Sequence, residues 1–229
     1  HRVTLFEKQA QLGGQLNIAA VPPRKKEIYR AVENLQHAAA MEGVSLRLGE
    51  PATQGLVLAL APDAVIVAVG ASSFTPRMSG VDGPNVRDAW KVLSGEQKVH
   101  GCVAVIGGGL VGCETAEHLA EQGCKVSIVE SLETIATGIS NTVLPTLLEN
   151  YRTYGVEQYT GHTVTSIGAD QLICEDKHGN AVHIPCDYVV MASGARSVSF
   201  DTSALIARGI AVVNIGDCAE VADIAHAIQ

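Results

Sequence analysis

Apolar residues along the chain fall into short runs, and the segments between the runs have helical spacing or contain glycine. Residues 102–106 (CVAVI) and 125–129 (KVSIV) predict two buried strands. Apolar positions over 110–122 predict the helix between them, and Gly123 would end it. Strands that alternate with helices in this way predict an α/β fold with mainly parallel sheets.

The strand pattern occurs twice. Residues 3–7 (VTLFE) resemble residues 126–130 (VSIVE), and residues 63–71 (DAVIVAVGA) resemble residues 187–195 (DYVVMASGA). The two offsets, 123 and 124, are almost the same. A long and nearly constant offset indicates a duplicated unit rather than a chance likeness between apolar strands. We therefore predict two Rossmann-like dinucleotide-binding folds.

A glycine-rich loop connects the strand at 102–106 to the helix. Its GxGxxG spacing lies between strand and helix, as in a dinucleotide-binding βαβ unit, although a purely structural glycine turn is the alternative. The first glycine would permit the tight turn, the second would let a pyrophosphate approach, and the third would let the helix pack closely. Free N–H groups at the helix N-terminus favour phosphate. The residues assigned to this site are Gly107, Gly108, Gly109, Leu110, Val111 and Gly112.

An acidic residue, Glu130, follows 18 residues after the last glycine of the loop. A carboxylate there accepts hydrogen bonds from the adenine ribose of NAD and repels the 2′-phosphate of NADP. Because residues 131–140 contain no Arg, we expect NAD rather than NADP. The alternative is an exposed Glu at the end of a strand, with no ligand.

The first copy of the repeat lacks its beginning. With an offset of 123, the matching glycine loop would precede His1, so this fold would lack its initial strand, loop and helix. Glu7 would keep the ribose-binding position. Because His1 is not an initiator Met, we expect a truncated chain. An unpaired sheet edge also makes a homo-oligomer possible.

Composition excludes several classes of function. The chain has 229 residues, with 16 Lys and Arg against 24 Asp and Glu, a net charge of −8 that argues against nucleic-acid binding. It has no apolar run of membrane-spanning length. The six cysteines form no CxxC pair and lack zinc or iron–sulfur spacing, so we expect no metal, reduced thiols and a cytoplasmic protein.

Two nested folds with these motifs resemble the FAD/NAD-linked reductases of the pyridine nucleotide–disulfide oxidoreductase type. The resemblance implies a partial FAD-binding domain over 1–98 and 196–229, with an NAD(P)-binding domain inserted at 99–195. Glu114 matches the family's acid near the nicotinamide, with a helix-surface or packing Glu as the alternative. Asp217 matches the acid that contacts the flavin ribityl–phosphate part, and it could also cap a helix over 218–227. The resemblance adds Glu114 and Gly194 to the NAD site that already contains Glu130, and it assigns to FAD Glu7, Lys8, Gly13, Gly14, Gln15, Gly70, Gly216 and Asp217.

A closer resemblance is to the C-terminal reductase region of 2-enoate and 2,4-dienoyl-CoA reductases, the old-yellow-enzyme-like NADH:flavin oxidoreductases. Residues 12–20 (LGGQLNIAA) with Pro22-Pro23 carry it, together with residues 88–95 and 216–218. It implies hydride transfer from NADH to FAD, and then electron transfer to a missing upstream barrel with FMN and a 4Fe–4S cluster that reduces a small-molecule substrate. The isolated chain would be inactive, and no acid–base residue is assigned.

The same motifs also fit other functions, and two further segments have a predictable local structure. A nucleotide-binding module without turnover, or a stand-alone NADH oxidase or flavoprotein reductase, would use the same motifs. The lack of a redox Cys pair argues against a glutathione-reductase-like enzyme. Residues 162–184 predict an insertion with a hairpin turn at Gly179-Asn180, and we expect the basic run 24–26 to be a solvated loop.

Overall fold

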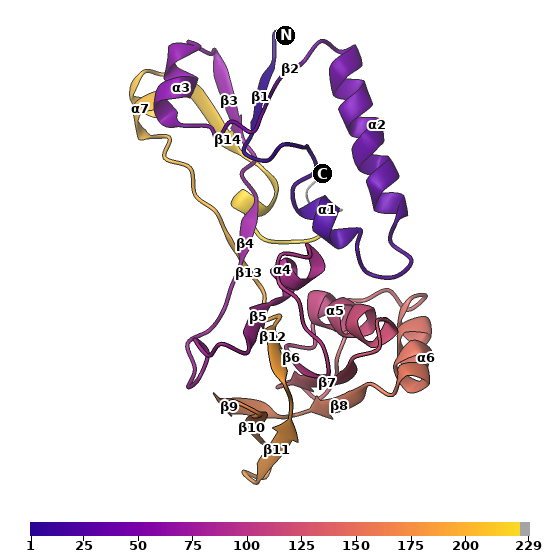
Figure 1. Ribbon diagram of the computed structural model, residues 1–229. Coiled ribbons are helices and arrows are strands. Elements are labelled where there is room, and N and C mark those ends of the chain that lie inside the picture. The colour runs from indigo at the N-terminus through magenta and orange to yellow at the C-terminus, as the bar shows by residue number, and fades with distance from the viewer. Residues whose placement is uncertain (225–229) are drawn as a thin grey trace. The chain divides into compact units, whose positions relative to one another are not determined.

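The computed structural model describes residues 1–224, and the chain forms two compact units (Figure 1). The first contains His1–Ala20, Lys26–Ser72 and residues 195–224. The second contains Val21–Lys25 and Ser73–Gly194.

A five-stranded parallel sheet forms the centre of the second unit, in the order β5-β12-β6-β7-β8. Its strands are β5 (Val86–Asp88), β12 (Tyr188–Met191), β6 (Cys102–Ile106), β7 (Lys125–Glu130) and β8 (Glu157–Thr160). β6 and β7 lie where the sequence predicts them. Both faces of the sheet are covered, which explains why the two central strands β6 (CVAVI) and β12 (YVVM) are continuous apolar runs rather than alternating ones.

The layers of this unit follow from the alternation of side chains along β6. Val103 and Val105 pack in the core on the helical side, with α4 (Ala89–Leu93), α5 (Leu110–Glu121) and α6 (Leu144–Tyr154). Ala104 and Ile106 point to the opposite side, toward a second core. Figure 1 shows the helices and the small sheet on opposite sides of the parallel sheet.

The small sheet is antiparallel, in the order β11-β10-β9, with β9 (Thr163–Ile167), β10 (Gln171–Glu175) and β11 (Ala181–Pro185). The predicted hairpin joins β10 to β11. Gly179 has φ +80° in that turn, and the Asp176 carboxylate accepts the N–H groups of His178 and Asn180. These bonds lower the pKa of Asp176 to about 2, the Asn180 bonds being the largest cause.

The first unit has two separate two-stranded parallel sheets. β1 (Thr4–Glu7) pairs with β2 (Ser45–Leu48), and β3 (Ala64–Val67) pairs with β14 (Ala211–Asn214). The helices of this unit are α1 (Gln15–Ala19), α2 (Glu27–Met41), α3 (Gln54–Ala59) and α7 (Ser203–Ala207). A short ladder pairs β4 (Ala71–Ser73) with β13 (Ala195–Ser197).

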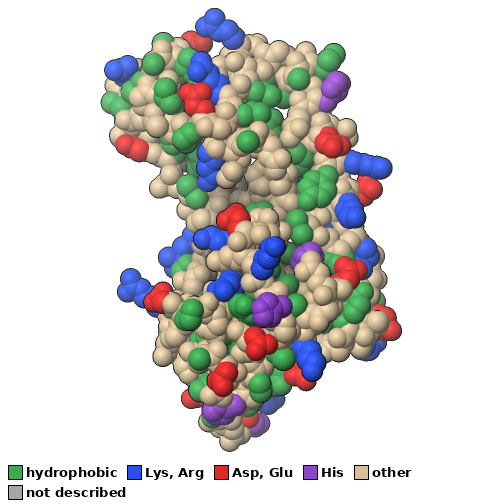
Figure 2. Space-filling model, in the orientation of Figure 1, with side chains coloured by type: hydrophobic (Ala, Val, Ile, Leu, Met, Phe, Trp, Pro, Cys, Tyr) green, Lys and Arg blue, Asp and Glu red, His purple; other side chains and the backbone are tan. Residues whose placement is uncertain are grey.

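The internal repeat shows what the first unit lacks. In the second unit β6 separates β7 from β12, whereas in the described part of the first unit no strand joins their counterparts β1 and β3. Leu5 is 36% exposed and Ile66 is 69% exposed, while their counterparts Ile128 and Val190 are fully buried. Figure 2 shows hydrophobic side chains at the surface of this unit. The predicted α/β class, with an incomplete first fold, is confirmed.

The extent of the first domain and the surroundings of Asp217 differ from the sequence-based expectation. Residues 73–98 were assigned to the first domain, but they belong to the second unit because β5 pairs with β12 and α4 packs in its core. Besides flavin contact, the sequence offered Asp217 a second role as the cap of a helix over 218–227. Asp217 lies in a 3₁₀ turn, Gly216–Cys218, and residues 219–223 after the turn are not helical. The end of the expected helix, 225–227, lies outside the described residues.

Candidate nucleotide-binding site

The glycine loop places the first turn of α5 directly on the end of β6. Gly107 has φ +104°, in the left-handed region, and its N–H donates to the Val129 carbonyl at 2.9 Å. A Cβ on Gly112 would overlap the Gly107 carbonyl oxygen and come within 2.9 Å of the Gly107 carbonyl carbon. Only glycine therefore lets the helix lie this close to the turn.

Gly109 differs from the other two glycines of the motif because space surrounds it. A Cβ at Gly109 would have no heavy atom within 4 Å. Gly109 is the N-cap of α5, and no side chain caps this end of the helix. The N–H groups of the first turn and the positive end of the helix dipole are thus available to an anion. Leu110 and Val111 follow, and each is a little over one-third exposed.

Glu130 holds the loop from the end of β7. Its Oε2 accepts the Gly108 N–H at 2.6 Å, and its Oε1 accepts the Leu132 N–H at 2.8 Å and the Ser131 hydroxyl at 3.0 Å. Burial by itself raises the pKa of this carboxyl. The backbone and hydroxyl donors outweigh burial, so the pKa lies below its ordinary value. Glu130 is therefore a charged acceptor fixed against the loop, not an isolated residue at the end of a strand.

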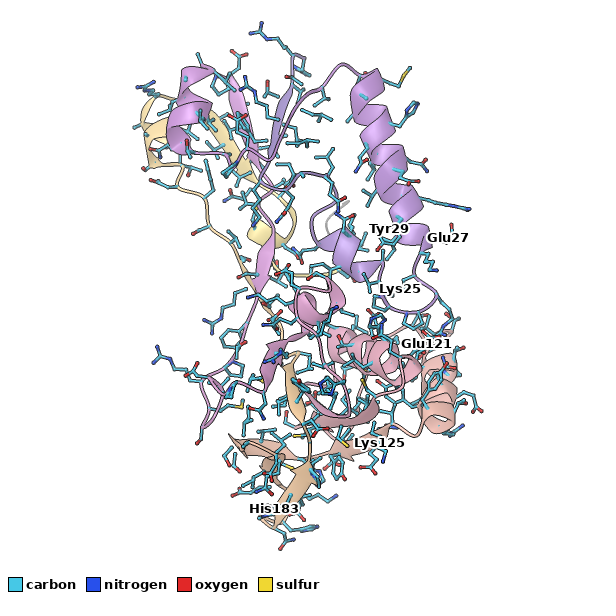
Figure 3. All side chains as sticks on the ribbon, viewed as in Figure 1. Lys25, Glu27, Tyr29, Glu121, Lys125 and His183 are labelled. Atoms are coloured by element: carbon cyan, nitrogen blue, oxygen red, sulfur yellow. The ribbon has the colours of Figure 1, made fainter. Side chains whose placement is uncertain are left out.

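The basic segment that we expected to be a solvated loop instead pairs with α5. Glu114 accepts a bond from Lys25, which Figure 3 labels in the segment before α2. One turn further along α5, Glu117 pairs with Arg24 and accepts the Asn150 amide at 2.6 Å. Glu117 is only 4% exposed, so a buried carboxylate explains why the segment packs here. Sequence reasoning missed Glu117, whose only signal was its i+3 spacing from Glu114.

The residues that follow β12 lie beside the glycine loop. Ala192 donates its N–H to the Ile106 carbonyl at 2.8 Å, and Gly194 has φ +102° with no atom near its Cβ position. Between them lies Ser193, whose hydroxyl is buried without a hydrogen-bond partner. The sequence analysis singled out Gly194 but gave Ser193 no role.

The residues assigned to FAD lie in the first unit. A Cβ on Gly70 would lie 3.0 Å from the Gln15 amide nitrogen, so the structure brings the glycine segment around Gly14 close to Gly70. Gly13 has φ +112° and Gly14 φ +49°. Glu7 accepts the N–H of Gln9 at 2.8 Å.

The remaining FAD candidates occupy a strand end and a turn. Lys8 is exposed directly after β1, and Gly216 has φ +59°. Asp217 accepts the Ala222 N–H at 3.2 Å, and its carbonyl accepts the Ser197 hydroxyl at 2.6 Å.

The cysteines supply no redox pair. All six are free thiols. Burial raises the pKa of Cys113, which follows the glycine loop, to about 11, so this thiol stays protonated near neutral pH. Within residues 1–224, no cluster of His, Cys, Asp or Glu could hold a metal ion. In the same range, no helix combines the length and the apolar character needed to cross a membrane.

Comparisons with known proteins identify the family and the fold. The model of the pyridine nucleotide-disulphide oxidoreductase family matches residues 1–224. A bilirubin reductase from Mediterraneibacter gnavus is 51% identical over 230 residues, and an NADH oxidase from Thermoanaerobacter brockii is 38% identical over 234 residues. Each alignment covers 100% of this chain and 36% of the relative. The chain thus spans little more than a third of their length.

Two further matches concern the closer resemblance. A cinnamate reductase from Clostridium sporogenes is 38% identical over 130 residues, which are 57% of this chain and 19% of that protein. The solved structure of a 2-naphthoyl-CoA reductase complex superposes with a TM-score of 0.91 at 28% identity, covering 100% of this chain and 35% of that one. These findings confirm the resemblance that the sequence motifs indicated. The chain belongs to the pyridine nucleotide-disulphide oxidoreductase family.

Proposed function

We propose that this chain is the NADH-binding and FAD-binding electron-input part of a larger reductase of the 2-enoate reductase type. The observation that carries the proposal is the loop between β6 and α5. Its Gly112 packs on the turn, its Gly109 is open to a ligand, and the Glu130 carboxylate is fixed beside it. These features fit a dinucleotide, whose pyrophosphate needs an open second glycine and whose adenine ribose needs an acceptor at the end of the second strand.

In this proposal the second unit selects NADH. The pyrophosphate would lie against residues 107–112 and the N-terminus of α5, with the adenine ribose on Glu130. The lowered pKa of Glu130 keeps a negative charge where NADP carries its 2′-phosphate, which favours NADH. Glu114, paired with Lys25, and Gly194 are proposed for the nicotinamide end.

The first unit would take FAD through residues in three places. Glu7 ends β1 and Lys8 follows it. The segment of Gly13, Gly14 and Gln15 lies near Gly70, and Gly216 and Asp217 belong to the 3₁₀ turn. Bound together, the two cofactors would supply hydride transfer from nicotinamide to flavin. The chain's residues would position them. Because this unit has no counterpart of β6 among its described residues, we expect weak FAD binding by the isolated chain.

The rest of the reductase would lie outside this chain. Relatives nearly three times as long leave room for an upstream barrel with FMN and a 4Fe–4S cluster, where a small-molecule substrate is reduced. The free thiols fit a reducing cytoplasm. A stand-alone NADH oxidase is the second candidate, favoured by the name of the Thermoanaerobacter brockii relative.

The test is calorimetric titration of the chain with NADH, with NADPH as the paired control. NADH binding well above NADPH binding supports the proposal, preference for NADPH overturns the reading of Glu130, and binding of neither overturns the nucleotide site. Flavin content and flavin reduction by NADH separate an electron-transfer module from a nucleotide-binding module without turnover. Stoichiometric yellow flavin in the purified chain would contradict the expected weak FAD affinity.

A further inference from the structure

Ser193 carries a polar group that nothing in the structure satisfies. Among residues 1–224, its Oγ is the one buried side-chain nitrogen or oxygen that has no hydrogen-bond partner. Buried hydroxyl groups in native proteins are almost always paired, because an unpaired one loses its bonds to water without replacement. A hydroxyl left unpaired beside a candidate ligand site points to a partner supplied by the ligand.

The position of Ser193 is fixed by the loop. The preceding residue, Ala192, donates its N–H to the Ile106 carbonyl at the end of β6. A Cβ built on Gly107 would come within 2.5 Å of the Ala192 carbonyl oxygen and 3.5 Å of the Ser193 nitrogen. Ser193 therefore borders the first glycine of the loop that is proposed to hold the pyrophosphate.

The order of strands tells which end of the dinucleotide Ser193 would meet. In the sheet β6 lies between β7 and β12. Glu130, at the end of β7, is proposed for the adenine ribose, and Ser193 follows β12 on the other side of the loop. A dinucleotide that lies across the carboxyl ends of these strands would therefore bring its nicotinamide half to Ser193.

The internal repeat separates a ligand role from a structural one. In the first copy, DAVIVAVGA, the residue aligned with Ser193 is Val69. Both copies make the same turn from strand to glycine, since Gly70 has φ +73° and Gly194 has φ +102°. The crossing itself thus does not need a hydroxyl at this position.

We propose that the Ser193 hydroxyl hydrogen-bonds to the nicotinamide nucleoside of bound NADH, through its ribose or its carboxamide, and so contributes to NADH affinity. The inference rests on the proposed function of the second unit. It adds a residue to that site for which no sequence motif gave a signal.

The experiment compares the wild-type chain with Ser193→Ala by calorimetric titration with NADH, ADP-ribose and ADP. We expect Ser193→Ala to weaken NADH binding by about 5- to 30-fold, the effect of one lost hydrogen bond to a desolvated group. ADP lacks the nicotinamide half, so its affinity should not change. ADP-ribose should weaken like NADH if the ribose is the partner, and behave like ADP if the carboxamide is.

The thermal midpoint of the free chain gives a second readout. Ser193→Ala removes an unpaired buried hydroxyl, so the midpoint should stay the same or rise, whereas loss of a structural hydroxyl would lower it. Ser193→Thr, which keeps a hydroxyl, should restore NADH affinity. The matched control is Ser127→Ala, whose hydroxyl is already bonded to Glu157 at 3.4 Å and lies on β7.

Three results decide the outcome. Unchanged NADH affinity in Ser193→Ala overturns the inference while leaving the proposed function in place. An equal loss of ADP and NADH affinity with a lowered midpoint shows a structural hydroxyl and also overturns it. If the wild-type chain binds none of NADH, ADP-ribose and ADP, the proposed function fails, and the inference fails with it.

Discussion

Two glycines of the loop should respond to the same substitution in opposite ways. Alanine at Gly112 would place a methyl group over the Gly107 carbonyl, within 2.9 Å of its carbon and 3.3 Å of the Ala192 Cβ. The carbonyl oxygen and carbon of Gly107 are backbone atoms, so they cannot move aside by a side-chain rotation. Alanine at Gly109 would meet no heavy atom within 4 Å, and the backbone there has φ −70°. Gly112→Ala therefore tests packing, and Gly109→Ala tests the approach of a ligand.

The magnitude for Gly112→Ala comes from two opposing effects. Alanine in place of glycine within a helix gains about 1 kcal/mol, whereas overpacking against backbone costs about 1–3 kcal/mol. The contact with the Gly107 carbonyl is severe, so the upper part of that range applies and the net loss is about 1–2 kcal/mol. For a chain of this size the thermal midpoint should fall by roughly 2–8 °C.

The assay is a thermal unfolding curve and an NADH titration for each variant. Gly109→Ala should lower the midpoint by at most about 3 °C, because alanine is only a poorer N-cap than glycine. Its NADH affinity should nevertheless fall at least about tenfold, since the methyl group stands where the pyrophosphate approaches. A Gly109→Ala chain with wild-type NADH affinity, or a Gly112→Ala chain as stable as wild type, would refute the reasoning.

Two further predictions concern charged groups of the second unit. Glu130→Gln should lower the ratio of NADH to NADPH affinity in paired titrations. The folded pKa of Glu130 lies below its ordinary value of 4.5, so its stabilisation is present above that pH and is lost as pH falls through the folded pKa. The variant should thus show a weaker loss of thermal midpoint on acidification, and an unchanged acid profile would contradict this. Arg24→Ala should destabilise the chain by about 1–2 kcal/mol in urea unfolding, because Glu117 is 4% exposed and keeps only its Asn150 bond. Arg30→Ala, which breaks an exposed pair with Glu27, should cost less than about 0.5 kcal/mol, and equal costs for the two variants would remove the special role of Glu117.

The local part of the candidate site could be predicted from the sequence. β6, the glycine loop, α5 and β7 are contiguous over residues 102–130, and their connections are short. The predicted helix over 110–122 differs from α5, Leu110–Glu121, by one residue. The glycine spacing, the apolar runs and the acid at the strand end are patterns among residues close together in the chain. Such patterns are enough to predict the strands, the loop and the helix of this segment.

The contacts that the sequence analysis missed join residues far apart in the chain. β5 has three partly buried residues and no apolar run, and it becomes a strand only because β12, a hundred residues later, offers an edge. Arg24 reaches Glu117 across 93 positions. The spacing of apolar residues along the chain does not predict such pairings, because they depend on which surfaces come into contact when the chain folds.

The sequence alone was enough to predict the fold class, the internal repeat and the position of the glycine loop between β6 and α5. Tertiary structure decided that the Glu130 carboxylate binds the Gly108 N–H and that the Ser193 hydroxyl is buried without a partner. The physical reason is that local conformational preferences act between near neighbours in the sequence. Burial and hydrogen-bond pairing are instead set by every segment that packs around a group.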